Sequence, residues 1–243
     1  MLESISDIIS NYGVFFLKGA GFTLMYSALT VLFGTLGGIV FALMKLSKSR
    51  ILRFVASLYI EVIRGTPLLV QLFIIFYGLP SIGINLDRTV AAVMALSINS
   101  SAYVAEIVRA GIQAVDKGQT EAGRSLGLSG WQTMRMIVLP QAIRNILPAL
   151  GNEFVTVIKE SSLASIIGLK ELMYNAQGTA TTTFLTMECY LVAAALYFIM
   201  TFTLSKILAY VEKRMRSESR MPHGSGMGKR MLGFGRSRGG DAK

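Results

Sequence analysis

The stretch Gly19–Met44, GAGFTLMYSALTVLFGTLGGIVFALM, decides the fold because its 26 consecutive residues carry no formal charge. As an α-helix that rises about 1.5 Å per residue, it would reach roughly 39 Å. That length exceeds a hydrocarbon core of about 30 Å and leaves room for tilt. The stretch therefore predicts a helix that crosses a membrane.

Four more stretches extend this pattern along the chain. We expect further spans at about residues 54–79, 89–112, 146–167 and 189–211. The second is interrupted by Glu61, Arg64 and Pro67, and the fourth is less apolar because it contains Glu153, Lys159 and Glu160. The fold class is all-α: a polytopic membrane protein with five transmembrane helices.

The composition agrees with a membrane protein. Of the 243 residues, 52% are apolar and only 16% are charged, whereas soluble chains carry about 25% charged residues. An ordinary soluble enzyme is excluded. The single cysteine, Cys189, and the single histidine, His223, also exclude a disulfide framework and a Cys/His zinc site.

Lysine and arginine set the orientation, because cytoplasmic loops carry an excess of them. The segment KLSKSRILR at residues 45–53 contains four basic residues and no acid, and the loop between the third and fourth spans contains Lys117, Arg124, Arg135 and Arg144. The other two loops contain only Arg88 and Lys170, each beside an acid. We expect the N-terminus outside and the C-terminus inside.

The net charge of +10 is concentrated at the C-terminal end. Residues 213–243 contain nine Lys/Arg and two Asp/Glu, and this end is rich in glycine. We expect a transmembrane domain at residues 1–216 and a disordered basic cytoplasmic tail at 217–243. The tail suits anionic lipid better than nucleic acid, because a nucleic-acid groove needs basic residues on a folded, aromatic surface.

The loop at residues 113–144 is too polar for lipid and too patterned for a floppy linker. Thr120 can cap a short helix with Glu121 in its first turn, and Gly127 can end that helix in a left-handed turn. A second short amphipathic helix is expected from Gly130, with one face formed by Trp131, Met134, Ile137 and Val138. Contact with a soluble partner and a position flat on the lipid headgroups explain this pattern equally well.

The same loop resembles the "EAA" loop of the membrane subunits of ABC importers. The resemblance rests on Glu121-Ala122-Gly123, Gly127, Ile137 and Leu139-Pro140 at the family's spacing, with Gly123 where the family usually has alanine. Two other runs, IEVIRGTPLLVQ at 60–71 and INSSAYVAEIVRAGIQAVDKGQ at 98–119, are similar to permeases for polar amino acids of the histidine, arginine, glutamine and glutamate type. The resemblance covers about residues 15–215.

The resemblance implies a type I importer in a bacterial inner membrane. Its partners would be a second permease, identical or paralogous, two cytoplasmic ATPases and an extracytoplasmic binding protein that delivers the amino acid. The loop would form the coupling helix, and its contacts with the ATPase fall on Glu121, Ala122, Gly127, Leu139 and Pro140. This chain has no GxxxxGK[ST] phosphate loop, so we expect it to bind no cofactor itself and the partner to bind ATP-Mg.

Ionisable residues at membrane depth are costly and indicate candidate substrate contacts. Glu153 and Glu160 lie two turns apart on one helix face, where they could hold an ammonium or guanidinium group; structural neutralisation explains them equally well. Asn99 and Ser100 could bind a substrate carboxylate, although small polar residues more often serve helix packing. Gly34 and Gly38 have the GxxxG spacing of a packing contact.

Two ion pairs are also expected from sequence spacing. Glu61 and Arg64, and Glu106 and Arg109, are each three residues apart and share a helix face, so neutralisation within each pair is the favoured explanation.

Two other functions are weighed against import. An enzyme is disfavoured because the spans contain no histidine, no HExxH motif and no paired aspartates. The remaining alternative is an ATP-independent channel or facilitator for small polar solutes.

Overall fold

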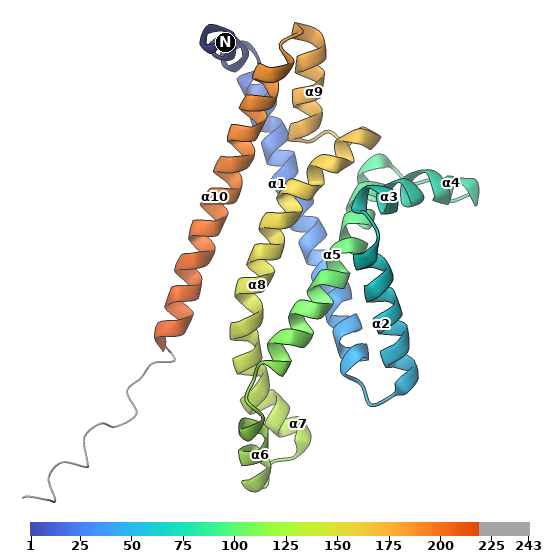
Figure 1. Ribbon diagram of the computed structural model, residues 1–243, viewed down its shortest axis with the longest axis vertical. Helices are drawn as coiled ribbons and strands as arrows, with labels where there is room; N and C mark the ends of the chain where they lie inside the picture. The colour runs from blue at the N-terminus through green and yellow to red at the C-terminus, as the bar shows by residue number, and fades with distance from the viewer. Residues whose placement is uncertain (219–243) are drawn as a thin grey trace, which may run out of the picture.

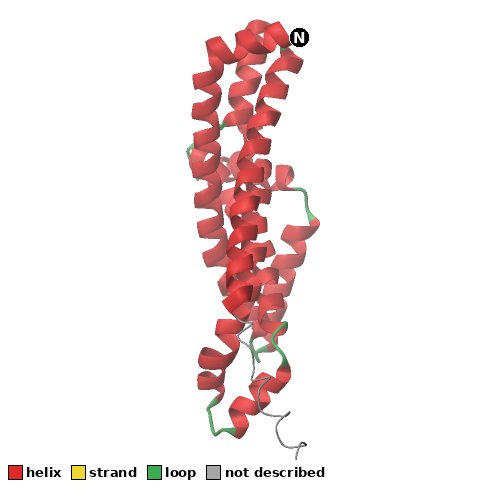
Figure 2. Ribbon diagram, turned by 90° about the vertical axis from the view of Figure 1, so that its left-hand side faces the viewer, coloured by secondary structure: helices red, strands yellow, loops and turns green. Residues whose placement is uncertain are grey.

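The computed structural model describes residues 1–218 of the chain, and within them every regular element is a helix. The long helices lie side by side in an elongated bundle, and two short helices at residues 117–133 form a knob at one end (Figures 1 and 2). The long elements are α1 (Leu2–Leu46), α2 (Arg50–Gly65), α5 (Arg88–Gln113), α8 (Leu139–Glu160) and α10 (Thr186–Glu218). The short elements are α3 (Leu68–Phe73), α4 (Leu79–Ser81), α6 (Lys117–Ser125), α7 (Gly130–Thr133) and α9 (Leu172–Thr183), with π-helices at Ile74–Gly78 and Met134–Val138 and a 3₁₀ helix at Ser161–Ile167.

Helix α1 contains the first expected span but begins much earlier. Its 45 residues correspond to about 68 Å of helix, roughly twice the thickness of a hydrocarbon core. The charge-free run is therefore the C-terminal part of a longer helix. The predicted tail at 217–243 falls almost entirely outside the described residues.

Glycines bring α1 into close contact with α5. A Cβ on Gly38 would lie 2.6 Å from the Cβ of Val104, and one on Gly34 would lie 2.9 Å from the Cβ of Ser100. No real Cβ makes such contacts, so only glycine allows the two backbones this separation. The predicted GxxxG packing contact is confirmed, and it fixes the position of α5 on α1.

The expected second span at 54–79 is sharply bent where Pro67 interrupts it. Helix α2 and the following Leu68–Ser81 segment are bent by 105° at Pro67. Thr66 is extended (φ −119°, ψ 145°) because a residue before proline is excluded from helical geometry. Gln71 closes the bend by donating from Nε2 to the carbonyl oxygens of Ile63 (2.7 Å) and Thr66 (3.1 Å).

The loop between the third and fourth spans differs from prediction at both ends. Asp116, and not Thr120, caps α6 by accepting a hydrogen bond from the backbone N–H of Gly118. The segment from Gly130 is not a separate helix, because α7, the π-helix and α8 follow one another without a break.

The α-helical part of the fourth span ends at Glu160, and the 3₁₀ segment beyond it ends at Gly168 with φ +84°.

A buried carboxylate joins the N-terminal half of α1 to α9 and α10. Glu171 is fully buried, and its carboxylate accepts hydrogen bonds from Thr23 Oγ1 (3.2 Å), Tyr197 Oη (2.6 Å) and the backbone N–H of Tyr174 (2.8 Å). Because an acid buried without partners is strongly unfavourable, these bonds hold the three helices in one arrangement.

Among the described residues, α1, α5 and α10 are long and apolar enough to cross a membrane. The bent pair of α2 with Leu68–Ser81 is a fourth such segment if it counts as one span. Helix α8, at the fourth expected span, is too polar to meet that measure. Asp87 caps α5 in the loop before it, and the hydrogen bond from the backbone N–H of Thr89 (2.8 Å) lowers the pKa of Asp87.

The α1–α5 contact generates the first prediction. Gly38→Ala should destabilise the protein by about 1–3 kcal/mol, because the new methyl group clashes with Val104 in a packed contact. The measurement is thermal unfolding in detergent. Gly21→Ala is the matched control, since a Cβ there meets nothing within 4 Å. Equal stability of the Gly38→Ala and Gly21→Ala variants would contradict the contact. Adding Val104→Ala to the Gly38→Ala variant should restore stability, because it removes the clashing side chain.

Candidate functional site

The knob formed by α6 and α7 has hydrogen-bonded ends. Gly127 lies in the left-handed region (φ +81°), where its backbone N–H donates to the carbonyl of Arg124 (3.0 Å), and the N–H of Leu128 donates to the carbonyl of Gly123 (3.1 Å). This pair of hydrogen bonds is a Schellman motif, so the prediction that Gly127 ends the helix in a left-handed turn is confirmed. A capping box between Ser129 and Gln132 starts α7.

Helix α6 rests on the beginning of the next helix through Gly123. A Cβ on Gly123 would lie 2.8 Å from Ile137 Cδ1 and 2.9 Å from Thr133 Cγ2. Glycine at this position therefore allows an unusually close contact between α6 and the π-helix. The departure from alanine noted in the sequence serves this packing.

The knob presents an exposed surface at the end of the bundle (Figure 1). The five predicted coupling residues are all exposed on it or at the start of α8: Glu121, Ala122, Gly127, Leu139 and Pro140. Leu126 (81% exposed) and Trp131 (71% exposed) add large apolar side chains. An apolar surface with a polar rim is typical of a protein-binding site.

A second candidate site is a cavity of about 490 Å³ between α2, α5 and α8, which we call the polar cavity because charged side chains contribute to its lining. Its volume lies within the usual range for small-molecule sites, about 300–1,000 Å³. The lining is formed by Arg64, Tyr103, Glu106, Ile107, Ala110, Gly111, Ala114, Asn145, Ala149 and Glu153.

The acids and bases of this cavity differ in how they are neutralised. Glu106 is paired with Lys45 (2.6 Å) and Arg109 (2.7 Å), which confirms the expected pair and adds Lys45. The pair expected between Glu61 and Arg64 does not form. Arg64 has no ion pair among the described residues, and its guanidinium lies 5.2 Å from the centre of the Tyr103 ring.

The four predicted substrate residues are only partly brought together. Glu153 is buried and accepts a hydrogen bond from Ser100 Oγ at 2.7 Å. Asn99 donates instead to Gln71 Oε1 at 3.0 Å, which ties α5 to the bent segment. Glu160 is half-buried two turns along α8 and does not line the cavity.

Arg64 and Tyr103 line this cavity but are not among the substrate residues expected from the sequence. The available signal was a cation in the last turn of α2, three residues before the proline at which the chain bends. Arg64 and Glu153 give one cavity both a cationic and an anionic side chain. That arrangement can bind a small molecule that carries an ammonium and a carboxylate group.

Apolar helices around a polar cavity, with an exposed knob at one end, define the membrane-spanning subunit of a transport system. The chain belongs to the family of binding-protein-dependent transport system inner membrane components, whose pattern matches residues 34–217. It is therefore a multi-pass protein of a bacterial inner membrane.

Individual relatives are similar over most of the chain. It is 41% identical over 204 residues to the arginine transport system permease protein ArtQ of Bacillus subtilis, covering 84% of this chain and 93% of that protein. A solved amino acid ABC transporter with histidines has 51% identity and a TM-score of 0.82, over 85% of this chain and 96% of that one. The inward-facing MetNI methionine ABC transporter shares the fold at 17% identity, with a TM-score of 0.72 over 84% and 97% of the two chains.

The bond between Ser100 and Glu153 generates the second prediction. Ser100→Ala should lower the free energy of unfolding by about 1–3 kcal/mol, because it leaves a buried carboxylate without its donor. Ser97→Ala on the same helix is the matched control, since Ser97 Oγ is buried without a hydrogen-bond partner and its loss should cost nothing. Thermal unfolding that places the two variants in the opposite order would contradict the assignment.

Proposed function

We propose that this chain is the permease subunit of an ATP-driven importer of polar amino acids, with basic amino acids as candidate substrates. The observation that carries the proposal is the cavity that contains both Arg64 and Glu153. The arginine would bind the α-carboxylate, and the glutamate would bind the ammonium group or a cationic side chain. The resemblance to an arginine permease and to an amino acid transporter solved with histidines supports this substrate class.

The four predicted substrate residues receive different roles in this proposal. Glu153 contacts the substrate, and Ser100 holds Glu153 in place. Asn99 positions the bent segment through Gln71. Glu160, two turns beyond Glu153 on α8, is a further anionic contact along the path of a cationic amino acid.

The knob would couple transport to ATP hydrolysis in a separate subunit. Glu121, Ala122 and Gly127 would lie in a groove of the ATPase, with Leu139 and Pro140 at the joint between the knob and α8. ATP-Mg would be bound by the ATPase, so this chain itself would need no cofactor and would catalyse no reaction. The further partners would be an extracytoplasmic binding protein and a second permease, identical or paralogous.

The proposed topology has five spans, with the N-terminus outside and the C-terminus inside. Helix α8 forms the fourth of these spans along the chain, and its 22 residues correspond to about 33 Å, enough to cross the hydrocarbon core. Its polar residues are compatible with that position because Glu153 faces the cavity and Ser100 instead of lipid. The alternative of an ATP-independent channel is not favoured, because the relatives are subunits of binding-protein-dependent and ABC systems.

The proposal is tested by reconstituting the chain with its ATPase in proteoliposomes and adding the cognate binding protein. Uptake of a labelled basic amino acid should require hydrolysable ATP. Uptake that proceeds equally without the ATPase would contradict the proposal.

Gly127 allows a sharp test of coupling. Gly127→Val should abolish amino-acid-stimulated ATPase activity, because a β-branched residue is strained at φ +81° by about 1–2 kcal/mol and distorts the end of α6. Gly127→Asn is the matched control, since asparagine tolerates this conformation and should retain most of the activity. The assay is ATP hydrolysis in proteoliposomes with the binding protein present. Full coupling in the valine variant would rule out the proposed role of the turn.

The charges of the cavity allow a separate test of the substrate site. Glu153→Gln should raise the KM for a basic amino acid by about tenfold or more, because a hydrogen bond to a charged group contributes about 1.5–3 kcal/mol. Arg64→Gln should weaken the uptake of every amino acid tested, since all of them carry the α-carboxylate. Glu61→Gln, one turn from Arg64 but outside the cavity, is the control. Unchanged kinetics in both cavity variants would place the substrate elsewhere.

A further inference from the structure

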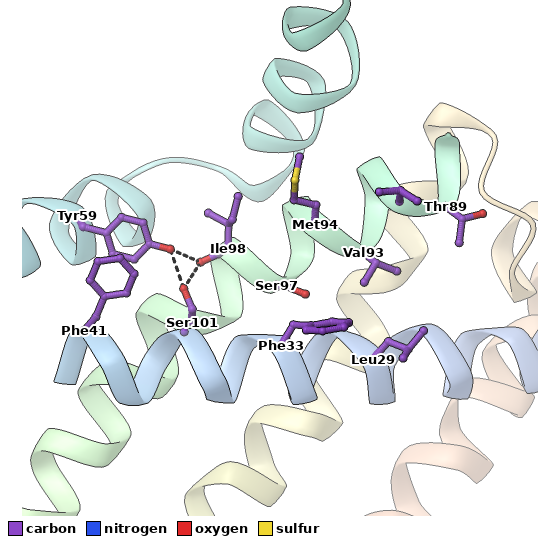
Figure 3. A pocket seen from close by; sticks show the side chains of 12 residues that line it. Leu29, Phe33, Phe41, Tyr59, Thr89, Val93, Met94, Ser97, Ile98 and Ser101 are labelled. Atoms are coloured by element: carbon purple, nitrogen blue, oxygen red, sulfur yellow. Dashed lines mark hydrogen bonds between the residues drawn. The ribbon is translucent and has the colours of Figure 1, made fainter. Parts of the chain in front are cut away.

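An apolar groove lies outside both candidate sites, between α1, α2 and α5 (Figure 3). Its volume is about 520 Å³, and its walls include Leu29, Phe33, Val90, Val93, Met94 and Ile98. It shares no lining residue with the polar cavity, although α5 contributes to both. The two sites use different sides of α5.

The polar atoms at one end of the groove are already satisfied by one another. Tyr59 Oη donates to the carbonyl of Ile98 (3.0 Å) and lies 2.7 Å from Ser101 Oγ, and the Tyr59 ring stacks on Phe41 with centroids 3.8 Å apart (Figure 3). The groove therefore presents mainly hydrocarbon to an occupant. A polar solute would find few groups to bind, whereas an acyl chain would match the walls.

The dimensions of the groove suit one leaflet of a bilayer. On α1 it extends from Leu29 to Phe41, a separation of twelve residues or about 18 Å of helix, all within the charge-free run. One leaflet of a hydrocarbon core is about 15 Å thick, half of the full 30 Å. A lipid chain that lies along the groove would span its leaflet.

The loop that joins α1 to α2 adds a positive charge beyond one end of the groove. Lys48, Arg50 and Arg53 are exposed and form no ion pair among the described residues, whereas Lys45 is already paired with Glu106. Lys48 follows Phe41 by seven residues, of which five continue α1 to Leu46 and correspond to about 8 Å of helix, so the basic residues lie beyond the Phe41 end of the groove. The segment 45–53 contains no acid.

We propose that this groove binds one anionic phospholipid, with an acyl chain between α1, α2 and α5 and the phosphate against Lys48, Arg50 and Arg53. An anionic lipid satisfies the apolar groove and the loop together. The assignment of the loop to the cytoplasmic leaflet rests on the orientation proposed above.

The acyl-chain half of the proposal is tested with the full chain purified in detergent. Native mass spectrometry would count the phosphatidylglycerol and phosphatidylcholine molecules, of equal acyl length, that remain bound. Val90→Trp at the exposed mouth of the groove should lower the bound phosphatidylglycerol about tenfold by filling it. Val14→Trp is the control, because Val14 is an exposed valine of α1 outside the groove.

The headgroup half is tested by removing charge. The triple variant Lys48→Gln, Arg50→Gln, Arg53→Gln should remove the preference for phosphatidylglycerol over phosphatidylcholine, because each basic residue near an anionic lipid contributes about fivefold in affinity. The control removes three charges from the other basic loop, through Lys117→Gln, Arg124→Gln and Arg135→Gln.

Each outcome decides the proposal independently of transport activity. Loss of phosphatidylglycerol in the Val90 variant together with loss of preference in the first triple variant would support it. Unchanged lipid in the Val90 variant, or equal losses in the two triple variants, would overturn it. A change of oligomeric state in the Val90 variant without a change in bound lipid would also overturn it and would assign the groove to a second copy.

Discussion

The close contact between α1 and α5 is the constraint on which the rest of the structure depends. Helices surrounded by lipid gain little from the hydrophobic effect between them, so they associate through close packing and interhelical hydrogen bonds. Gly34 and Gly38 allow α5 to approach until Ser100 and Val104 fill the space that a side chain would need. This approach fixes the rotation of α5, and Ser100 then reaches Glu153 on α8.

The same rotation separates the three surfaces to which we assign functions. One side of α5 faces the polar cavity, and another forms a wall of the apolar groove. Beyond α5 the chain forms the knob, and from Gly130 it continues without a break through α7, the π-helix and α8. From Gly130 to Glu153 this helical stretch is about 35 Å long, so in the proposed importer a displacement of the knob would act directly on the cavity.

Local sequence signals predicted the features that depend on neighbouring residues. The run at 19–44 predicted the apolar part of α1, and Gly127 predicted the left-handed turn because few residues other than glycine adopt that conformation. The N-cap of α6 was missed although Thr120 and Asp116 are both good capping residues. Val115 is buried in one cluster with Val138 and Ala142, and this burial fixes the position of the backbone at Val115. The next residue, Asp116, therefore becomes the N-cap of α6.

Other features depend on partners that are distant in sequence and could not be predicted. The buried Glu171 carboxylate is satisfied by Thr23 and Tyr197, which are 148 and 26 residues away. Pro67 indicated a break in the second span, but its 105° bend is set by Gln71 and the packing of α3 on α5. Arg64 was judged a partner of Glu61 from their spacing, whereas the fold places it in the cavity with Glu153.

The central claim is that the α6–α7 knob contacts the ATPase, and cross-linking tests it most directly. With the buried Cys189 replaced by serine, a single cysteine is introduced at Ala122 on the exposed face of α6 or at Ser49 in the α1–α2 loop. After treatment of the assembled complex with a short bifunctional thiol reagent, gel electrophoresis should show the Ala122 variant joined to the ATPase and the Ser49 variant unlinked. No adduct from position 122 in a complex that still imports amino acid on ATP would contradict the account.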